Sequence, residues 1–306
     1  MIRPFELHDL AGLRRLAEHG LCLDTRLALT REVRSLPTAF WASLFPGTLA
    51  RTYVWEGPHG TEAYAQLRHG EGSPLARLMF LAPSQFLDAR ACGSLVEGLL
   101  REAGRRGAQH LLAEAEEGSP IFGFLRQEGF AVYARQAVWA LDQPRTVSLP
   151  PAGVLRPQRA RDLLTVRSLY AAVVPALIAQ VEPAPREARG WVLFQESDLV
   201  GSIDVQSGPR GIWLEPFFHP AARDVAEAMH SILANLRPTA ARPAYVCVRS
   251  YQNWLGPILA EAGLTRWGEQ AVLVRRIVVP ISERRTQSAP AIEHSATRAT
   301  SIRGHS

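Results

Sequence analysis

The chain has 306 residues, 47% of them hydrophobic, which is enough apolar material for roughly two packed domains and excludes a wholly disordered protein. No apolar stretch reaches the roughly 18 residues of a membrane span, and the N-terminus lacks the hydrophobic run of a signal peptide, so we expect a cytoplasmic protein with no membrane partner. The net charge of +5 comes from arginines scattered along a chain without lysine, and the three cysteines lack metal-ligand spacing, so we expect neither a nucleic-acid partner nor a metal.

The first half of the chain predicts a mixed α/β layer. A short strand at 2–4 is followed by a helix on which Leu10, Leu13 and Leu16 share one face. Three strand-like runs come next, and Pro83 stops the last of them. Helix and strand then alternate, with Gly129 at the left-handed position that ends a helix. The expected elements are strands over 49–55, 62–68, 75–82, 110–115 and 136–141 and helices over 95–100 and 121–128.

The second half repeats this order, which predicts a tandem duplication. Expected strands over 191–195, 199–206, 211–218, 244–248 and 270–276 alternate with helices near 225–236 and 254–262 in the same way. The matching residues are Arg3-Pro4 with Arg156-Pro157, Asp9-Leu10 with Asp162-Leu163, Ala89-Arg90 with Ala222-Arg223, Gly129 with Gly263, and Gln136-Ala137-Val138 with Gln270-Ala271-Val272.

Composition sets the expected domain boundaries. A stretch rich in proline joins the copies, so we expect a first domain over 1–142, a linker over 143–153 and a second domain over 154–280. Residues 281–306 hold few large apolar side chains and are expected to form a disordered tail. Each domain is expected to build its own mixed sheet flanked by helices, with few contacts to the other domain.

Three features together resemble the GNAT superfamily of acyl-CoA-dependent N-acetyltransferases. They are Arg3-Pro4 in the opening strand, the strand that ends at Pro83 before a helix, and Glu128-Gly129-Phe130 near the end of the copy. The resemblance implies an α/β fold with two GNAT-like domains in tandem. It also implies transfer of an acetyl group from acetyl-CoA to an amine of a small molecule or peptide by direct attack, in a monomer or homodimer.

In this family the diphosphate of the cofactor binds backbone amides of a glycine-containing loop at a helix N-terminus. The acetyl-CoA-binding residues that the resemblance implies in the first copy are Leu81, Ala82, Arg90, Ala91, Cys92, Gly93 and Ser94. In the second copy Asp224 replaces the first glycine, and its charge would repel a phosphate by about 3 kcal/mol at roughly 6 Å. The first copy is therefore the better candidate for the cofactor.

No motif marks the catalytic residues. Leu125 and Leu259 stand where the family often has a tyrosine that protonates the thiolate. Glu215, in the fourth strand of the second copy, and Glu114, at the end of the fifth strand of the first, are the candidates for a catalytic base. We interpret the chain as an N-acetyltransferase. The alternative is a catalytically inactive duplicated protein that binds a ligand, senses acyl-CoA or acts as a scaffold.

Overall fold

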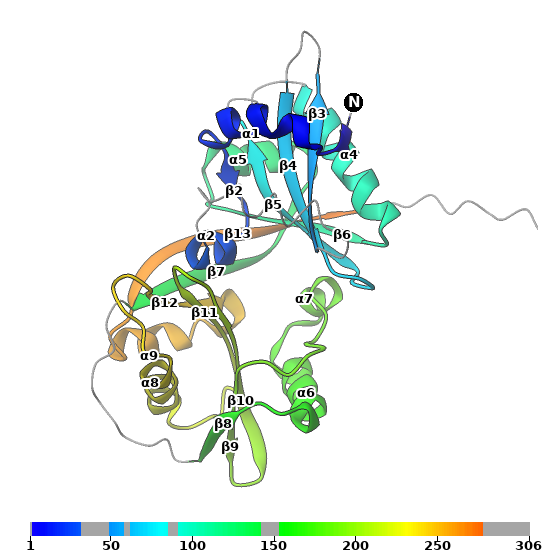
Figure 1. Ribbon diagram of the computed structural model, residues 1–306. Helices are drawn as coiled ribbons and strands as arrows, with labels where there is room; N and C mark the ends of the chain where they lie inside the picture. The colour runs from blue at the N-terminus through cyan, green and yellow to red at the C-terminus, as the bar shows by residue number, and fades with distance from the viewer. Residues whose placement is uncertain (1, 32–48, 58–61, 85–90, 142–152, 278–306) are drawn as a thin grey trace, which may run out of the picture.

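The computed structural model describes residues 2–31, 49–57, 62–84, 91–141 and 153–277 (Figure 1). Residues 143–152 of the linker predicted over 143–153, and the whole of the tail predicted over 281–306, lie outside the described residues. The elements of the first half are β1 (Ile2–Pro4), η1 (Leu7–Asp9), α1 (Leu10–Ala17), β2 (Leu21–Cys22), α2 (Thr25–Thr30), β3 (Ala50–Glu56), β4 (Glu62–His69), β5 (Leu75–Ala82), α4 (Ala91–Arg105), β6 (His110–Ala115), α5 (Pro120–Gln127) and β7 (Ala131–Leu141).

The second half repeats this order, except that within the described residues it has no counterpart of β2 and adds one short helix before its last helix. Its elements are β8 (Val154–Pro157), η5 (Ala160–Asp162), α6 (Leu163–Val173), α7 (Ala176–Val181), β9 (Trp191–Gln195), β10 (Asp198–Ser207), β11 (Ile212–Phe218), α8 (Val225–Leu236), β12 (Ala244–Arg249), η6 (Ser250–Gln252), α9 (Leu255–Glu261) and β13 (Thr265–Arg276).

The opening turns of the two halves have the same geometry. Arg3 donates two hydrogen bonds of 2.7 Å to the carboxylate of Asp9. Arg156 holds Asp162 in the same way, at 2.7 and 2.8 Å. Such paired bonds fix the orientation of both side chains, and both aspartates are buried. The repeated Arg-Pro and Asp-Leu motifs therefore build one structural device twice.

The helix ends match as well. Gly129 follows α5 with a φ of 77°, and Gly263 follows α9 with a φ of 87°. A side chain is strained in this left-handed conformation, so glycine is required at both positions. The repeated glycines thus occupy equivalent places, as the duplication predicts.

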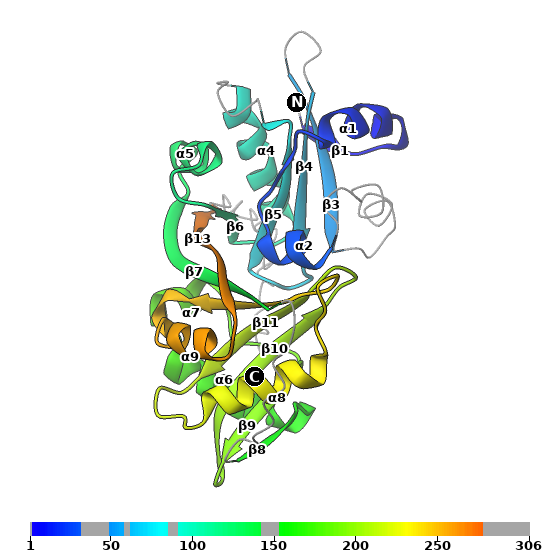
Figure 2. The same ribbon diagram turned by 90° about the vertical axis from the view of Figure 1, so that its left-hand side faces the viewer.

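All strands belong to one sheet within the described residues, in the order β1-β3-β4-β5-β6-β13-β7-β12-β11-β10-β9-β8, with β2 added beside β5. The last strands of the two halves are exchanged. β13 pairs with β6 of the first half (Figure 2), and β7 pairs with β12 of the second (Figure 1). β7 and β13 also pair with each other, with Gln136 opposite Gln270. The prediction of a mixed α/β fold is confirmed, but the prediction of two separate sheets is wrong.

The hydrophobic core of each half includes residues of the exchanged strand. The main core of the first half packs α4 and α5 on the sheet and takes Ala271 and Leu273 from β13. The main core of the second half packs α8 and α9 and takes Leu141 from β7. Each half therefore buries apolar surface that belongs to the other, and neither half is closed without its partner's last strand.

Candidate functional site

In the first half, two parallel strands separate partway along their length. β5 and β6 pair only from Leu75 to Arg77, and the space between them beyond Arg77 is called here the first gap. The chain itself fills this gap. Leu23 donates its N–H to the carbonyl of Met79 at 2.9 Å on one side and accepts from the N–H of Glu114 at 2.9 Å on the other. The preceding β2 pairs with β5, which places Leu21 opposite Leu81.

Glu114 anchors this inserted segment (residues 21–25). One of its oxygens accepts the N–H of Thr25 at 2.8 Å, and the other accepts from Arg77 at 3.3 Å. The side chain is buried, so the candidate base is engaged in holding α2 at the sheet. Of the other predicted residues here, Leu81 faces the inserted segment and Ala82 is fully buried opposite Tyr64.

The N-terminus of α4 is the place predicted for the diphosphate. Arg90 lies outside the described residues, while Ala91 and Cys92 begin the helix. Ser94 accepts a hydrogen bond of 2.8 Å from the indole of Trp55. A Cβ on Gly93 would lie 3.3 Å from a carboxylate oxygen of Glu128. A carboxylate therefore already stands beside this helix N-terminus, where it complements the helix dipole and would repel a phosphate.

The second half has an equivalent space, called here the second gap, between β11 and β12 beyond their paired residues 212–214 and 244–246. A single side chain, that of Gln252 in η6, reaches the edge of β11 that borders this gap. The Gln252 amide accepts from the N–H of Phe218 at 3.0 Å and donates to the carbonyl of Pro216 at 2.9 Å. Gln252 is 1% exposed. Its amide satisfies the two strand groups that a ligand amide would need.

The backbone N–H groups of the loop before α8 also have hydrogen-bond partners within the protein. The N–H groups of Ala221 and Ala222 bond to His219, and that of Arg223 bonds to the side chain of Gln195 at 3.1 Å. Asp224 stands at the N-cap position of α8, where its side chain makes no capping hydrogen bond, and its φ of 54° is the left-handed conformation that glycine favours. The predicted replacement of a glycine by an aspartate thus stands in a loop whose three preceding amides already have partners.

A cleft of about 430 Å³ opens between the two halves. Among the residues that line it, Arg26 and Arg77 come from the first half, and Tyr170, Glu182, Asp204, Glu215 and Phe217 from the second. The predicted candidate Glu215 therefore faces a cavity, whereas Glu114 does not line it. Tyr170 and Phe217 form an aromatic pair with ring centres 5.5 Å apart.

The two carboxylates of the cleft are neighbours. Asp204 and Glu215 stand opposite each other on the paired strands β10 and β11. Glu215 accepts from the Trp213 indole at 2.7 Å, and one oxygen of Asp204 accepts from Gln206 at 3.0 Å. The other oxygen of Asp204 is buried without a hydrogen-bond partner among the described residues. Burial, and then the charge of Glu215, raise the pKa of Asp204 above its usual value.

Glu182 joins the two halves at the edge of the cleft. Its carboxylate lies 2.7 Å from Arg249 and 3.6 Å from Arg77, and it accepts a hydrogen bond from Tyr133. Burial alone would raise the pKa of Glu182, but Arg249 and Arg77 outweigh it and hold the pKa below its usual value. Sequence reasoning missed Glu182, Asp204 and Gln252, because no local pattern marks a residue whose partners come from distant strands.

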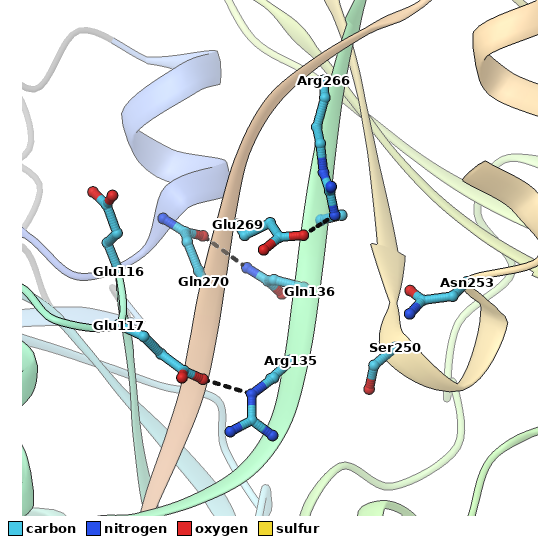
Figure 3. Close-up of a pocket in the computed structure, with 10 residues that line it drawn as sticks. Glu116, Glu117, Arg135, Gln136, Ser250, Asn253, Arg266, Glu269 and Gln270 are labelled. Carbon is cyan, nitrogen blue, oxygen red and sulfur yellow. Dashed lines mark hydrogen bonds and ion pairs between the residues drawn. The ribbon is translucent and has the colours of Figure 1, made fainter. Parts of the chain in front are cut away.

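A second pocket, of about 320 Å³, lies over the exchanged strands (Figure 3). Apart from Glu116, the charged groups that line it are paired with one another. Arg135 bonds to Glu117 at 2.6 Å, and Arg266 pairs with Glu269. Gln136 donates to Gln270 at 3.0 Å. Because these paired charges neutralise each other, this pocket attracts a charged ligand less than the cleft does.

Two solved structures have the same architecture over most of the chain. A GCN5-related N-acetyltransferase from Sphaerobacter thermophilus superposes with a TM-score of 0.58 at 15% identity, covering 90% of this chain and 95% of that one. A tandem GNAT protein from the clavulanic acid biosynthesis pathway gives 0.55 at 14% identity, covering 91% and 99%. No family model matches the sequence, and no curated protein matches it.

These likenesses extend over both halves, so the chain has a tandem GNAT fold, as the sequence motifs implied. At this level of identity the likeness concerns the fold and not the reaction. No described helix is long and apolar enough to cross a membrane. The described residues also contain no group of His, Cys, Asp or Glu side chains arranged to hold a metal ion.

Proposed function

We propose that this protein binds a small molecule in the cleft between its halves and does not transfer acyl groups, so that the GNAT fold serves as a binding scaffold. The observation that carries this proposal is the inserted segment, residues 21–25, which occupies the first gap. Acetyl-CoA would need the strand edges that this segment and Gln252 now use. The residues at the cofactor site predicted in the first copy, and at its counterpart in the second, therefore do not fit the cofactor.

The cost of opening each gap supports this view. Opening the first gap breaks the bonds of Leu23 and Thr25 and exposes the Leu23 side chain, at about 5 kcal/mol in total. That cost would weaken the binding of a cofactor more than a thousandfold. Opening the second gap breaks only the two bonds of Gln252, at about 2 kcal/mol. Asp224 would then add its repulsion of the diphosphate.

The second candidate function is N-acetylation of an amine with acetyl-CoA as co-substrate. One observation favours it: Glu215 lines the cleft on the strand that borders the second gap, where a carboxylate is able to accept a proton from an amine. Under this alternative the cofactor would enter the second half, since one side chain closes that gap. This reverses the sequence-based preference for the first copy.

Calorimetric titration with acetyl-CoA and with free CoA separates the two functions. The proposal predicts no binding heat for either compound with the wild-type protein. Gln252→Ala empties the second gap, and Asn253→Ala, an exposed neighbour, is its matched control. Binding of acetyl-CoA by the wild-type protein near one equivalent contradicts the proposal. Tighter binding by Gln252→Ala than by Asn253→Ala would assign the site to the second half.

A further inference from the structure

The two gaps are joined by a chain of charged side chains that crosses from the first half to the second. At the first gap, one oxygen of Glu114 accepts the N–H of Thr25 at 2.8 Å, and the other accepts from Arg77 at 3.3 Å. Arg77 lies 3.6 Å from Glu182 of the second half, and Glu182 accepts from Arg249 at 2.7 Å. The name ionic chain is used here for Glu114, Arg77, Glu182 and Arg249. These side chains are 7–22% exposed, so solvent screens their charges only weakly.

The far end of the ionic chain sets the position of the residue that closes the second gap. Arg249 ends β12, and η6, which contains Gln252, follows directly. Within the described residues, the guanidinium of Arg249 bonds to Glu182 alone, and its Nη1 has no partner. A buried guanidinium that loses its carboxylate is strongly disfavoured where it stands, so it must move toward water. Because η6 starts at the next residue, this movement would carry Gln252 away from β11.

Glu182 is the residue at which side chains of the two halves compete for one acceptor. Its Oε1 accepts from Arg249 and from the Tyr133 hydroxyl, and the same oxygen lies 3.6 Å from Arg77. Arg77 is held on its other side by its bond to Glu114. When Glu114 releases Arg77, the attraction of opposite charges draws Arg77 toward this oxygen, where it competes with Arg249. A change at the first gap is thereby passed on to Arg249.

A second line of hydrogen bonds, called here the amide line, joins the same two places. The hydroxyl of Thr25 donates to Oε1 of Gln270 at 2.6 Å, and the amide of Gln136 donates to the same oxygen at 3.0 Å (Figure 3). The thiol of Cys247 in turn donates to Oε1 of Gln136 at 3.4 Å. Cys247 lies on β12, two residues before the end of that strand. The ionic chain and the amide line therefore both run from the inserted segment to the strand that borders the second gap.

We infer that the two gaps are conformationally coupled, chiefly through the ionic chain. Loosening the inserted segment in the first half withdraws Gln252 from the second gap, and withdrawing Gln252 loosens the inserted segment. A coupling free energy between two sites acts equally in both directions. The inference goes beyond the proposed function, because it concerns how the gaps open and not what binds in the cleft. The first half thus regulates the closure of the second gap.

Hydrogen exchange followed by NMR tests the first direction. The Phe218 amide bonds to the Gln252 side chain and reports opening of the second gap, while the Ile212 amide, at the paired end of β11, is the reference. Glu114→Gln keeps an acceptor oxygen but removes the charge that starts the ionic chain. It should speed the exchange of Phe218 relative to Ile212 at least fivefold. Leu13→Ala, which removes a buried side chain of the first half outside both lines, is the control and should leave this ratio unchanged. An unchanged ratio in Glu114→Gln, or an equal change in Leu13→Ala, overturns the inference.

The reverse direction is tested at the inserted segment. Gln252→Ala should speed the exchange of the Leu23 amide at least fivefold, whereas exposed Asn253→Ala should not change it. Glu182→Gln cuts the ionic chain at its centre and leaves the amide line, whose neutral hydrogen bonds are weaker. In this background Gln252→Ala should speed Leu23 exchange less than twofold. An effect of the same size with and without Glu182→Gln, or no effect on Leu23, contradicts the inference.

Discussion

The two gaps of the molecule descend from one repeated unit but are closed by different means. A stretch of backbone closes the first gap, hydrogen-bonded to both strands and anchored by Glu114. The second gap is closed by one side chain, that of Gln252, which bonds to the edge of β11. A backbone segment has several bonds and a buried leucine to lose, whereas an amide side chain has two bonds. The same position of the fold can therefore be closed firmly or with little free energy, and a sequence motif does not reveal which.

The largest expected effect is on the anchor of the first gap. Glu114→Ala removes a buried carboxylate that serves both Thr25 and Arg77. Such losses cost about 3–5 kcal/mol, because the remaining buried groups lose their partner. The free energy of unfolding, measured with urea, should fall by this amount. Exposed Glu116→Ala is the matched control and should change it by less than about 0.5 kcal/mol.

The effect at the second gap should be smaller. Gln252→Ala leaves the N–H of Phe218 and the carbonyl of Pro216 without their partner, at about 2 kcal/mol of unfolding free energy. Urea unfolding of this variant beside exposed Asn253→Ala measures it. A loss equal to that of Glu114→Ala would mean that the two gaps are closed equally firmly, which contradicts the difference expected between them.

A third prediction concerns Asp204 in the cleft that both halves share. Unlike the first two substitutions, a change here should stabilise the protein. The pKa of Asp204 is raised in the folded protein, so its charged form destabilises the fold at neutral pH. Asp204→Asn should therefore raise the melting temperature at pH 7. The gain should vanish as the pH falls through the raised pKa towards the usual value of about 3.9. A melting temperature that drops at pH 7 would show that the carboxylate is satisfied.

Much of the fold follows from the sequence. The Arg-Pro and Asp-Leu repeats, the matching glycines and the helix–strand order predicted the duplicated α/β architecture. The strand exchange was not predictable, and the repeat itself is the reason. Gln136-Ala137-Val138 and Gln270-Ala271-Val272 are identical, so either strand fits beside β6 by local pattern. Which one pairs there depends on the path of the chain between the halves.

The site was predicted only in part. Glu215 was singled out from its place in a strand, and it does line a cavity. Glu114 was chosen by the same reasoning, but its carboxylate holds the inserted segment. The role of Leu23 in filling the first gap could not be predicted. The segment around it has no hydrophobic periodicity, and its hydrogen-bond partners, Met79 and Glu114, are far away in sequence. The assignment of acetyl-CoA to Gly93 and its neighbours stays a prediction.

Residues 21–25 of the chain itself occupy the first gap. Hydrogen exchange of the Leu23 and Glu114 amides, followed by NMR with and without a large excess of acetyl-CoA, tests this most directly. Both amides lie in the bonds that close the gap, so both should exchange slowly and at the same rate in the two conditions. Exchange as fast as that of an exposed amide, or a loss of protection on adding acetyl-CoA, would contradict the account.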